Sequence, residues 1–218
     1  METVSQAHLD ALLKDGEVLL RAGDKSRIVL RPDQSIVKMF RSKRRLRHAK
    51  RFIKCAKTYH RKGITTVEPS SLYCCPEDDC VFVTYPYLDG MTVKQLIAQG
   101  DDTVLAQVVD FMIALHDIGI YYRDFHPGNL IVRDDHIAVI DMHNTHFFPF
   151  ALGIRRRAKN IAAFFFRNQT AGLFSEEQIN NFVHDYLDRA NLRPAQQVRF
   201  WKHFARYREE RQLWLARK

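Results

Sequence analysis

The segment YRDFHPGN, residues 122–129, is the most informative part of this 218-residue chain. Within it, Asp124 and Asn129 are separated by a Pro-Gly pair that favours a turn. Two short apolar runs follow, LIV and IAVI, with the polar stretch RDDH between them. This pattern predicts two strands joined by a turn. Asp141 is therefore expected at the end of the second strand.

Upstream of this segment, the sequence predicts a sheet with one inserted helix. Apolar runs bounded by Gly, Pro, Asp and Ser indicate strands, and five are found: EVLLR (17–21), RIVLR (27–31), SIVKMF (35–40), SLYCC (71–75) and VFVTYPYL (81–88). A short amphipathic helix is expected at 4–14, before the first strand. We assign residues 1–88 to a first domain and residues 89–218 to a second one.

The inserted helix carries the charge of the chain. Residues 41–62 hold 11 Lys and Arg and no acid, which leaves 23 of the 34 basic residues and all 25 acidic ones elsewhere. The formal charge of +9 therefore belongs to one segment. Apolar positions recur there at steps of three and four, which predicts a helix with one narrow apolar stripe; its members are Leu46, Ala49, Ile53, Ala56 and Tyr59.

The second domain is predicted to be mainly helical. Residues 91–99 and 101–118 have helical patterns, and the 77 residues after the two strands have apolar spacing typical of further helices. Together with the sheet of the first domain, this indicates the α+β class. At 46% hydrophobic and 27% charged, the composition is that of a globular protein and excludes global disorder.

The pattern around residues 122–141 resembles the catalytic loop of the protein-kinase-like superfamily, in which Asp and Asn lie five apart and a second Asp follows two strands. Lys38, in the stretch Ile-Val-Lys, resembles the nucleotide-binding Lys of the third strand in that superfamily. Taken singly, Asp124 and Asn129 are as typical of an ordinary turn as of a catalytic loop. The joint pattern favours the resemblance, which implies a bilobal fold with a five-stranded antiparallel sheet and one helix in the small N-lobe and a mainly helical C-lobe.

The resemblance also implies a set of site residues and the cofactors ATP and Mg²⁺. Asp124 would accept the proton of the attacking hydroxyl, and His126 would lie near the transferred phosphate. Asn129 and Asp141 would supply the hard oxygen ligands that Mg²⁺ prefers. The expected ATP-binding residues in the first domain are Lys38 and Gly23.

Longer stretches narrow the resemblance. YYRDFHPGNLIV, with SIVKMF before a very basic helix, is similar to bacterial lipopolysaccharide core (Kdo/heptose) kinases and their toluene-tolerance-type relatives. That family implies ATP-dependent phosphorylation of a sugar of the lipopolysaccharide core, with an anionic glycolipid or phosphorylated sugar as substrate. Aminoglycoside-type small-molecule kinases and RIO-like protein kinases stay as alternatives, although no peptide-docking segment typical of protein kinases is recognisable.

One departure from the superfamily concerns the partner of Lys38. Active kinases usually supply a Glu for this Lys from the first helix after the third strand, and residues 41–62 contain none. Three alternatives stay open: Glu68 substitutes, Lys38 pairs with Asp141 until nucleotide binds, or the chain is a pseudokinase. The retained Asp124, Asn129 and Asp141 favour an active enzyme.

The uncompensated basic helix favours an anionic partner, because like charges four residues apart repel each other. We expect peripheral contact with a membrane or a phosphorylated glycolipid through 41–62, and rank nucleic acid lower; an ordinary solvated face is the alternative. The acidic N-terminus lacks a secretory signal, and no apolar run reaches the ~20 residues that span a bilayer. A cytoplasmic protein, peripheral on the inner membrane, is predicted.

The four cysteines give no zinc-binding spacing. Cys75 and Cys80 flank the turn PEDD, so they are expected to face each other across a hairpin. Buried or half-buried thiols are the favoured interpretation, with a disulfide or a metal site as the alternative.

Overall fold

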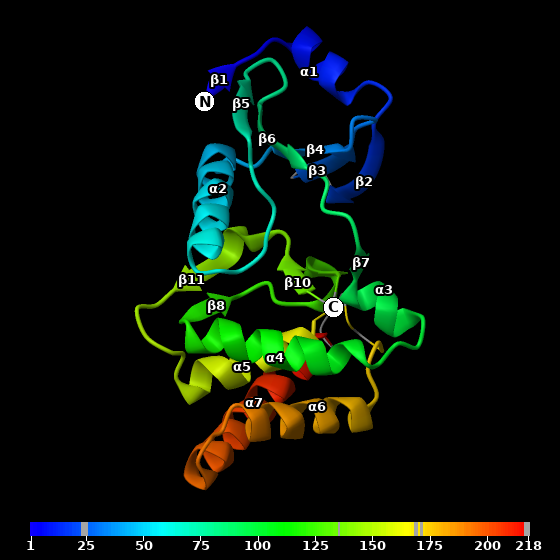
Figure 1. Ribbon diagram of the computed structural model, residues 1–218. Coiled ribbons are helices and arrows are strands. Elements are labelled where there is room, and N and C mark those ends of the chain that lie inside the picture. The colour runs from blue at the N-terminus through cyan, green and yellow to red at the C-terminus, as the bar shows by residue number, and fades with distance from the viewer. Residues whose placement is uncertain (23–25, 135, 168–169, 171, 216–218) are drawn as a thin grey trace. The chain divides into compact units, whose positions relative to one another are not determined.

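The computed structural model describes residues 1–22, 26–134, 136–167, 170 and 172–215 (Figure 1). The chain folds as two compact units, Met1–Asp89 and Gly90–Lys218. The first unit is a sheet with two helices and the second is mainly helical, so the predicted α+β class is confirmed. The roles predicted for the two domains, nucleotide binding and catalysis, stay predictions.

The first unit contains a six-stranded mixed sheet in the order β1-β5-β6-β4-β3-β2. The strands are β1 (Glu2–Thr3), β2 (Glu17–Ala22), β3 (Ser26–Leu30), β4 (Ser35–Phe40), β5 (Ser71–Cys75) and β6 (Cys80–Pro86). The five predicted strands are present and pair antiparallel. The predicted five-stranded sheet is wrong in one respect, because the two-residue β1 pairs parallel with β5. Two residues are too few to show a periodic pattern.

Two helices cover the sheet of the first unit. Helix α1 (Gln6–Leu13) begins at Ser5, whose hydroxyl accepts from the His8 N–H, and it buries Leu9 in an apolar cluster with β3, β4 and β6. Helix α2 (Arg45–Arg61) contacts β6 and β4. Its buried face differs from the predicted stripe, because Phe52 and Cys55 are buried whereas Leu46 and Ile53 are only half-buried. Packing against the aromatic rings of Phe40 and Tyr85 turns this face toward Phe52.

The second unit places short strands above a group of helices (Figure 1). Its strands form two sheets, β10-β9-β7 and β11-β8. The strands are β7 (Met91–Thr92), β8 (Ile120–Tyr122), β9 (Leu130–Arg133), β10 (His136–Val139) and β11 (Thr145–Phe147). The helices are α3 (Val93–Ala98), α4 (Val104–Asp117), α5 (Ile154–Phe165), α6 (Glu176–Arg189) and α7 (Pro194–Leu215), with two 3₁₀ turns, η1 (Pro127–Asn129) and η2 (Met142–Asn144).

The two small sheets hold both ends of the segment 122–141. Strand β8 pairs antiparallel with β11, and β9 pairs antiparallel with β10. Asp124 therefore lies just after one paired strand, and Asn129 just before another. Beneath them, α5 contacts α7, and Phe125 from the loop packs in a T-shaped or tilted contact with Tyr122 and Phe164.

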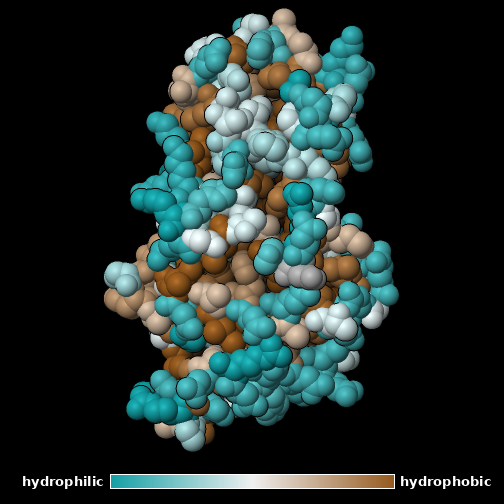
Figure 2. All heavy atoms as spheres, viewed as in Figure 1, coloured by the Kyte–Doolittle hydropathy of each residue, from teal (hydrophilic) through white to brown (hydrophobic). Residues whose placement is uncertain are grey.

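Hydrophilic side chains cover much of the face drawn in Figure 2, including the region of α6. Among the described residues, no helix is both long and apolar enough to cross a membrane.

Candidate active site

The hydroxyl of Tyr122 joins the two ends of the predicted catalytic segment. Tyr122 is fully buried, and its Oη donates to the carbonyl oxygen of Ile140 at 2.8 Å, with the carbonyl oxygen of Asp141 at 3.2 Å. The same Oη accepts from Nδ2 of Asn129 at 2.9 Å. One buried hydroxyl thus ties the amide of Asn129 to the backbone that carries Asp141. The sequence analysis did not single out Tyr122, although it stands next to the segment's Arg-Asp pair.

The amide of Asn129 is oriented by the loop itself. Nδ2 of Asn129 also donates its second hydrogen to the carbonyl oxygen of Asp124 at 3.1 Å. Asn129 is only 8% exposed. Both amide hydrogens are thereby committed, so Oδ1 is the group through which Asn129 would coordinate a cation. The backbone of Asn129 also accepts from the N–H of Ile140 at 3.0 Å, which holds the amide beside the strand that ends at Asp141.

Asp141 adopts a left-handed backbone conformation, with φ 56° and ψ 39°. For a residue other than Gly this costs about 1–2 kcal/mol, and such strain persists where the surrounding structure imposes it, often at functional sites. Its carboxylate oxygen Oδ1 lies 2.9 Å from Nδ1 of His143, and its side chain is about one-third exposed. The carboxylate is thus accessible and held by a neighbour two residues on.

His126 is held neutral at physiological pH. Burial and the positive charge of Arg167 lower the pKa of His126 to about 4, against the opposing effect of the Asp124 and Asp141 carboxylates. Its Nδ1 accepts from the N–H of Gly128 at 3.2 Å, which leaves the proton of the neutral ring on Nε2. A side chain at position 128 would press on this ring, because an added Cβ would lie 3.3 Å from two of its atoms. His126 therefore offers one N–H donor within electrostatic range of both carboxylates.

Asp124, the predicted base, is anchored from the end of α5. Nη1 of Arg167 lies 3.1 Å from Oδ1 of Asp124, and a second guanidinium nitrogen of Arg167 donates to the carbonyl oxygen of Arg123. Both side chains of the ion pair are mostly buried. The sequence analysis missed Arg167, because no local pattern links a residue after α5 to a loop more than 40 positions earlier.

A buried network supports the loop from below. Nδ2 of Asn160 donates to the carbonyl oxygen of Tyr122 at 2.7 Å, and its Oδ1 lies 3.2 Å from Nε2 of His116. Nδ1 of His116 lies 2.8 Å from Oη of Tyr186, which also accepts from Arg157 at 3.2 Å. Burial and the charge of Arg157 lower the pKa of His116 to about 3. The neutral imidazole links helices α4, α5 and α6 to the strand that leads into the catalytic segment.

The oxygens of Asn129 and Asp141 suit Mg²⁺. This cation prefers hard oxygen ligands and is commonly held by one or two side chains plus phosphates and water. Among the described residues, no cluster of three or more His, Cys, Asp and Glu side chains is arranged to hold a metal by itself. A pair of side chains that needs phosphate oxygens to complete the shell fits an ion bound together with a nucleotide.

Lys38 of β4 lies in the first unit, where an aromatic ring of α2 faces it. Its Nζ is 4.8 Å from the centre of the Phe52 ring and 5.9 Å from that of Phe40, and the residue is 4% exposed. A cation over an aromatic face is stabilised by about 0.5–2 kcal/mol. Glu68, the predicted substitute for the helix acid, is exposed. Gly23, the other predicted ATP-binding residue, lies outside the described residues.

The charge of segment 41–62 is partly compensated by the turn between β5 and β6. Nη1 of Arg41 donates to Oδ1 of Asp78 at 2.9 Å, and Arg45 pairs with Asp79. The prediction of an uncompensated basic run is therefore wrong for these two residues, because the fold brings acids from about 35 positions away. Four further cations in or just before the first turns of α2 border an open cavity of about 700 Å³: Lys43, Arg44, Arg47 and Lys50.

The cysteines lie where the sequence predicts them. Cys75 and Cys80 lie opposite each other across the β5–β6 hairpin, and all four cysteines are free thiols. Burial raises the pKa of Cys80 to about 12. The disulfide alternative does not apply.

Comparisons with known proteins agree on the fold. No protein-family model matches the chain. A protein of Invertebrate iridescent virus 3, named as a serine/threonine-protein kinase, is 46% identical over 52 residues, which are 21% of this chain and 16% of that protein. The chain thus matches well under two thirds of that relative's length.

Solved structures resemble nearly the whole chain. WaaP in complex with acyl carrier protein has a TM-score of 0.55 at 19% identity, over 94% of this chain and 91% of that one. The aminoglycoside phosphotransferase APH(3'')-Id from Streptomyces rimosus has a TM-score of 0.66 at 9% identity, over 93% and 96%. APH(2'')-IIa in a complex with streptomycin and ATP has a TM-score of 0.62 at 13% identity, over 92% and 85%. The chain therefore has the protein-kinase-like fold predicted from its sequence.

Proposed function

We propose that the chain is an ATP-dependent phosphotransferase that phosphorylates a sugar hydroxyl of the lipopolysaccharide core or of a similar glycolipid. The observation that carries the proposal is the assembly of Asp124, Asn129 and Asp141 through the Tyr122 hydroxyl and the paired strands around it. A loop that only turned the chain would not need an oriented amide oxygen beside a strained, accessible carboxylate.

Each residue has a distinct role in this proposal. Asp124 accepts the proton of the acceptor hydroxyl as its oxygen attacks the terminal phosphorus, and ADP leaves. Asn129 and Asp141 hold Mg²⁺, and Lys38 neutralises phosphate oxygens. Bound ATP with its metal supplies the phosphoryl group and most of the charge neutralisation that this reaction requires. His126 donates its Nε2 hydrogen near the transferred group.

Release of ADP tests the proposal. Purified protein with ATP, Mg²⁺ and core oligosaccharide should release ADP, and Asp124→Asn should slow the release by about 10²–10⁴-fold, the usual contribution of a general base. Asp188→Asn, an exposed Asp of α6, is the matched control and should leave the rate unchanged. Equal rates for Asp124→Asn and the unchanged protein would show that Asp124 is not the base.

The lack of a Glu in residues 41–62 favours one alternative: a kinase-like module that binds ATP without transferring phosphate. In that case Mg²⁺ and ATP would raise the melting temperature of the protein, and ADP would not form with any acceptor. Turnover that depends on Asp124 would exclude this alternative.

The cations at the start of α2 support a peripheral membrane contact. Near an anionic membrane each Lys or Arg contributes about 1 kcal/mol. Flotation with phosphatidylglycerol vesicles, and its loss when Lys43, Arg44, Arg47 and Lys50 are replaced by Gln, would test this contact. Phosphatidylcholine vesicles are the control.

A further inference from the structure

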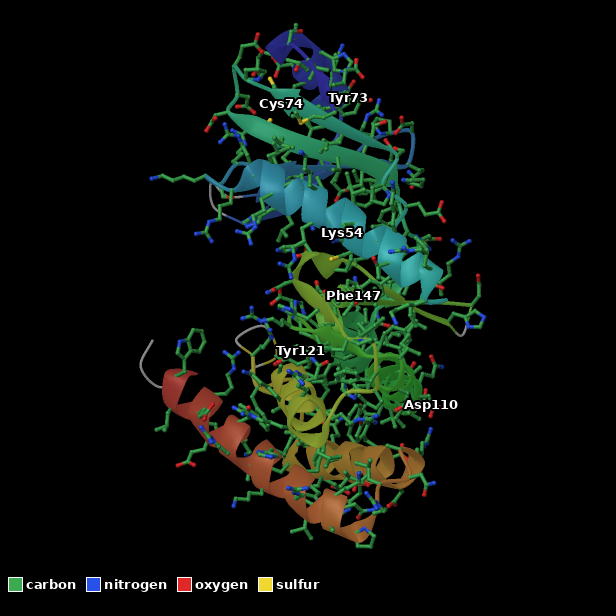
Figure 3. All side chains as sticks on the ribbon, turned by 90° about the vertical axis from the view of Figure 1, so that its left-hand side faces the viewer. Lys54, Tyr73, Cys74, Asp110, Tyr121 and Phe147 are labelled. Carbon is green, nitrogen blue, oxygen red and sulfur yellow. The ribbon has the colours of Figure 1, made fainter. Side chains whose placement is uncertain are left out.

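A cavity of about 260 Å³ in the second unit lies against Asp124. Three elements form it: the end of β8 with the residues after it, one face of α5, and the last turns of α7. Tyr121 is one of the residues that line it, and Figure 3 shows this residue next to α5. Two small side chains of α5, Ala162 and Ala163, are among the residues that line it. Larger residues at these positions would fill the space.

The cavity has an excess of positive charge. Four cations line it, and they are Arg123, Lys159, Arg167 and Arg211. Its two acids are already paired: Asp124 with Arg167 at 3.1 Å, and Glu210 with Arg206, which is outside the cavity, at 2.8 Å. In a partly enclosed site such an excess attracts anions more strongly than it would on an open surface.

Two of these cations lie over aromatic rings. Nζ of Lys159 is 5.1 Å from the centre of the Tyr207 ring, and Cζ of Arg211 is 5.8 Å from that of the Trp214 ring. Among the described residues, neither Lys159 nor Arg211 forms an ion pair with a carboxylate. Aromatic walls with a few placed charges are typical of small-molecule sites.

We propose that this cavity binds the acceptor through an anionic group, a carboxylate or a phosphate, that is separate from the reacting hydroxyl. The inference rests on the proposed function, because Asp124 lines the same cavity and is the predicted base for that hydroxyl. Lys159 and Arg211 contact the anion, and the rings of Tyr121, Tyr207 and Trp214 contact the apolar face of the sugar. A polycationic acceptor such as an aminoglycoside is repelled from this site.

Tryptophan fluorescence tests the site directly, because Trp214 lines it. The full chain is titrated with D-glucuronate, D-glucose 6-phosphate, D-glucose and kanamycin through the millimolar range. We expect saturable binding of at least one anionic sugar, at least about tenfold tighter than that of glucose or kanamycin, a factor equivalent to about 1.4 kcal/mol. Tighter binding of glucuronate assigns a carboxylate, and tighter binding of glucose 6-phosphate assigns a phosphate.

Charge-neutral variants locate the binding. Lys159→Gln with Arg211→Gln should weaken binding of the anionic sugar at least about tenfold. The matched control is Lys202→Gln with Arg199→Gln, which neutralises two exposed cations of α7 outside the cavity and should leave binding unchanged. Anionic binding that survives in the first variant, or glucose binding as tight as that of both anions, overturns the inference. So does the absence of anionic binding.

The two proposals fail separately. Anionic sugar binding that depends on Lys159 and Arg211, without ADP release from any acceptor, would retain the site and reject the phosphotransferase. ADP release that depends on Asp124 but proceeds equally well with neutral acceptors, and is unaffected by replacing Lys159 and Arg211, would retain the enzyme and reject the site.

Discussion

At the scale of single residues, the candidate site is built by side chains that orient other side chains. Tyr122 contributes no predicted ligand, yet its hydroxyl fixes the Asn129 amide and the backbone before Asp141. Arg167 does the same for Asp124. The residues predicted from their spacing in the sequence are those that would contact ATP, metal and acceptor. The side chains that orient them are seen only in the folded structure.

Replacing Tyr122 by Phe should uncouple this arrangement. The buried carbonyl of Ile140 and one amide hydrogen of Asn129 would lose their partner, which costs about 1–3 kcal/mol of unfolding free energy. Affinity for ADP with Mg²⁺ should fall as the amide loses its orientation. Urea unfolding and calorimetric titration measure the two effects. Tyr73→Phe, on the half-buried face of β5, is the control and should cost less than about 0.5 kcal/mol; equal effects of the two changes would contradict the role of Tyr122.

Asp141→Asn separates charge from backbone strain. Asn tolerates the left-handed conformation as Asp does, so the unfolding free energy should change by less than about 0.5 kcal/mol. The lost carboxylate should reduce the rate of ADP release by at least about 10²-fold, as expected when charge stabilisation of a transferring phosphoryl group is lost. We therefore expect strongly reduced ADP release from a variant whose free energy of unfolding is unchanged. Turnover at the original rate would remove Asp141 from the metal site.

At the scale of elements, the short strands set where the catalytic segment begins and ends. Gly119 ends α4 and leads into β8 with φ +78°, and an added Cβ would collide with the carbonyl oxygens of Phe148 and Phe150. The N–H of Phe148 also donates to the carbonyl of Gly119 at 2.8 Å. This close approach aligns β11 with β8, and so fixes the strand that leads to Asp124.

Gly119→Ala should therefore lower the free energy of unfolding by more than the left-handed conformation of residue 119 alone explains. Gly100 has a similar φ of +84° but nothing within 4 Å of an added Cβ. Gly100→Ala should cost about 1 kcal/mol from the left-handed conformation, whereas Gly119→Ala should add about 1–3 kcal/mol for the steric overlap. Urea unfolding of both variants measures the difference. Equal costs would mean that the backbone moves aside without penalty.

At the scale of the whole molecule, the buried His116 and the half-buried His126 make stability depend on pH. The folded-state pKa values of His116 and His126 are lowered to about 3 and about 4, chiefly by burial, from 6.5. The unfolded chain therefore binds more protons below pH 6.5, and the stabilisation is complete above that pH and lost as the pH falls. Each group contributes a slope of up to about 1.4 kcal/mol per pH unit between its two pKa values.

Unfolding by urea from pH 7 to pH 4 measures this slope. His116→Gln should lower the stability at pH 7, because the network around Asn160 loses a partner, and should reduce the pH slope below 6.5. His136→Gln, an exposed His of β10, should change neither. The same slope in all three proteins would show that His116 does not titrate as described.

Local patterns were sufficient to predict the order of the helices and strands and the α+β class. They also predicted where Asp124, Asn129 and Asp141 lie relative to the ends of the strands, because strand ends and turns depend on neighbouring residues. Three contacts were decided by tertiary packing alone: Phe52 of α2 faces Lys38, Asp78 and Asp79 neutralise part of the basic segment, and Arg167 meets Asp124. Each joins residues from separate elements, and the way such elements pack depends on side chains far apart in the chain that no short periodic pattern records.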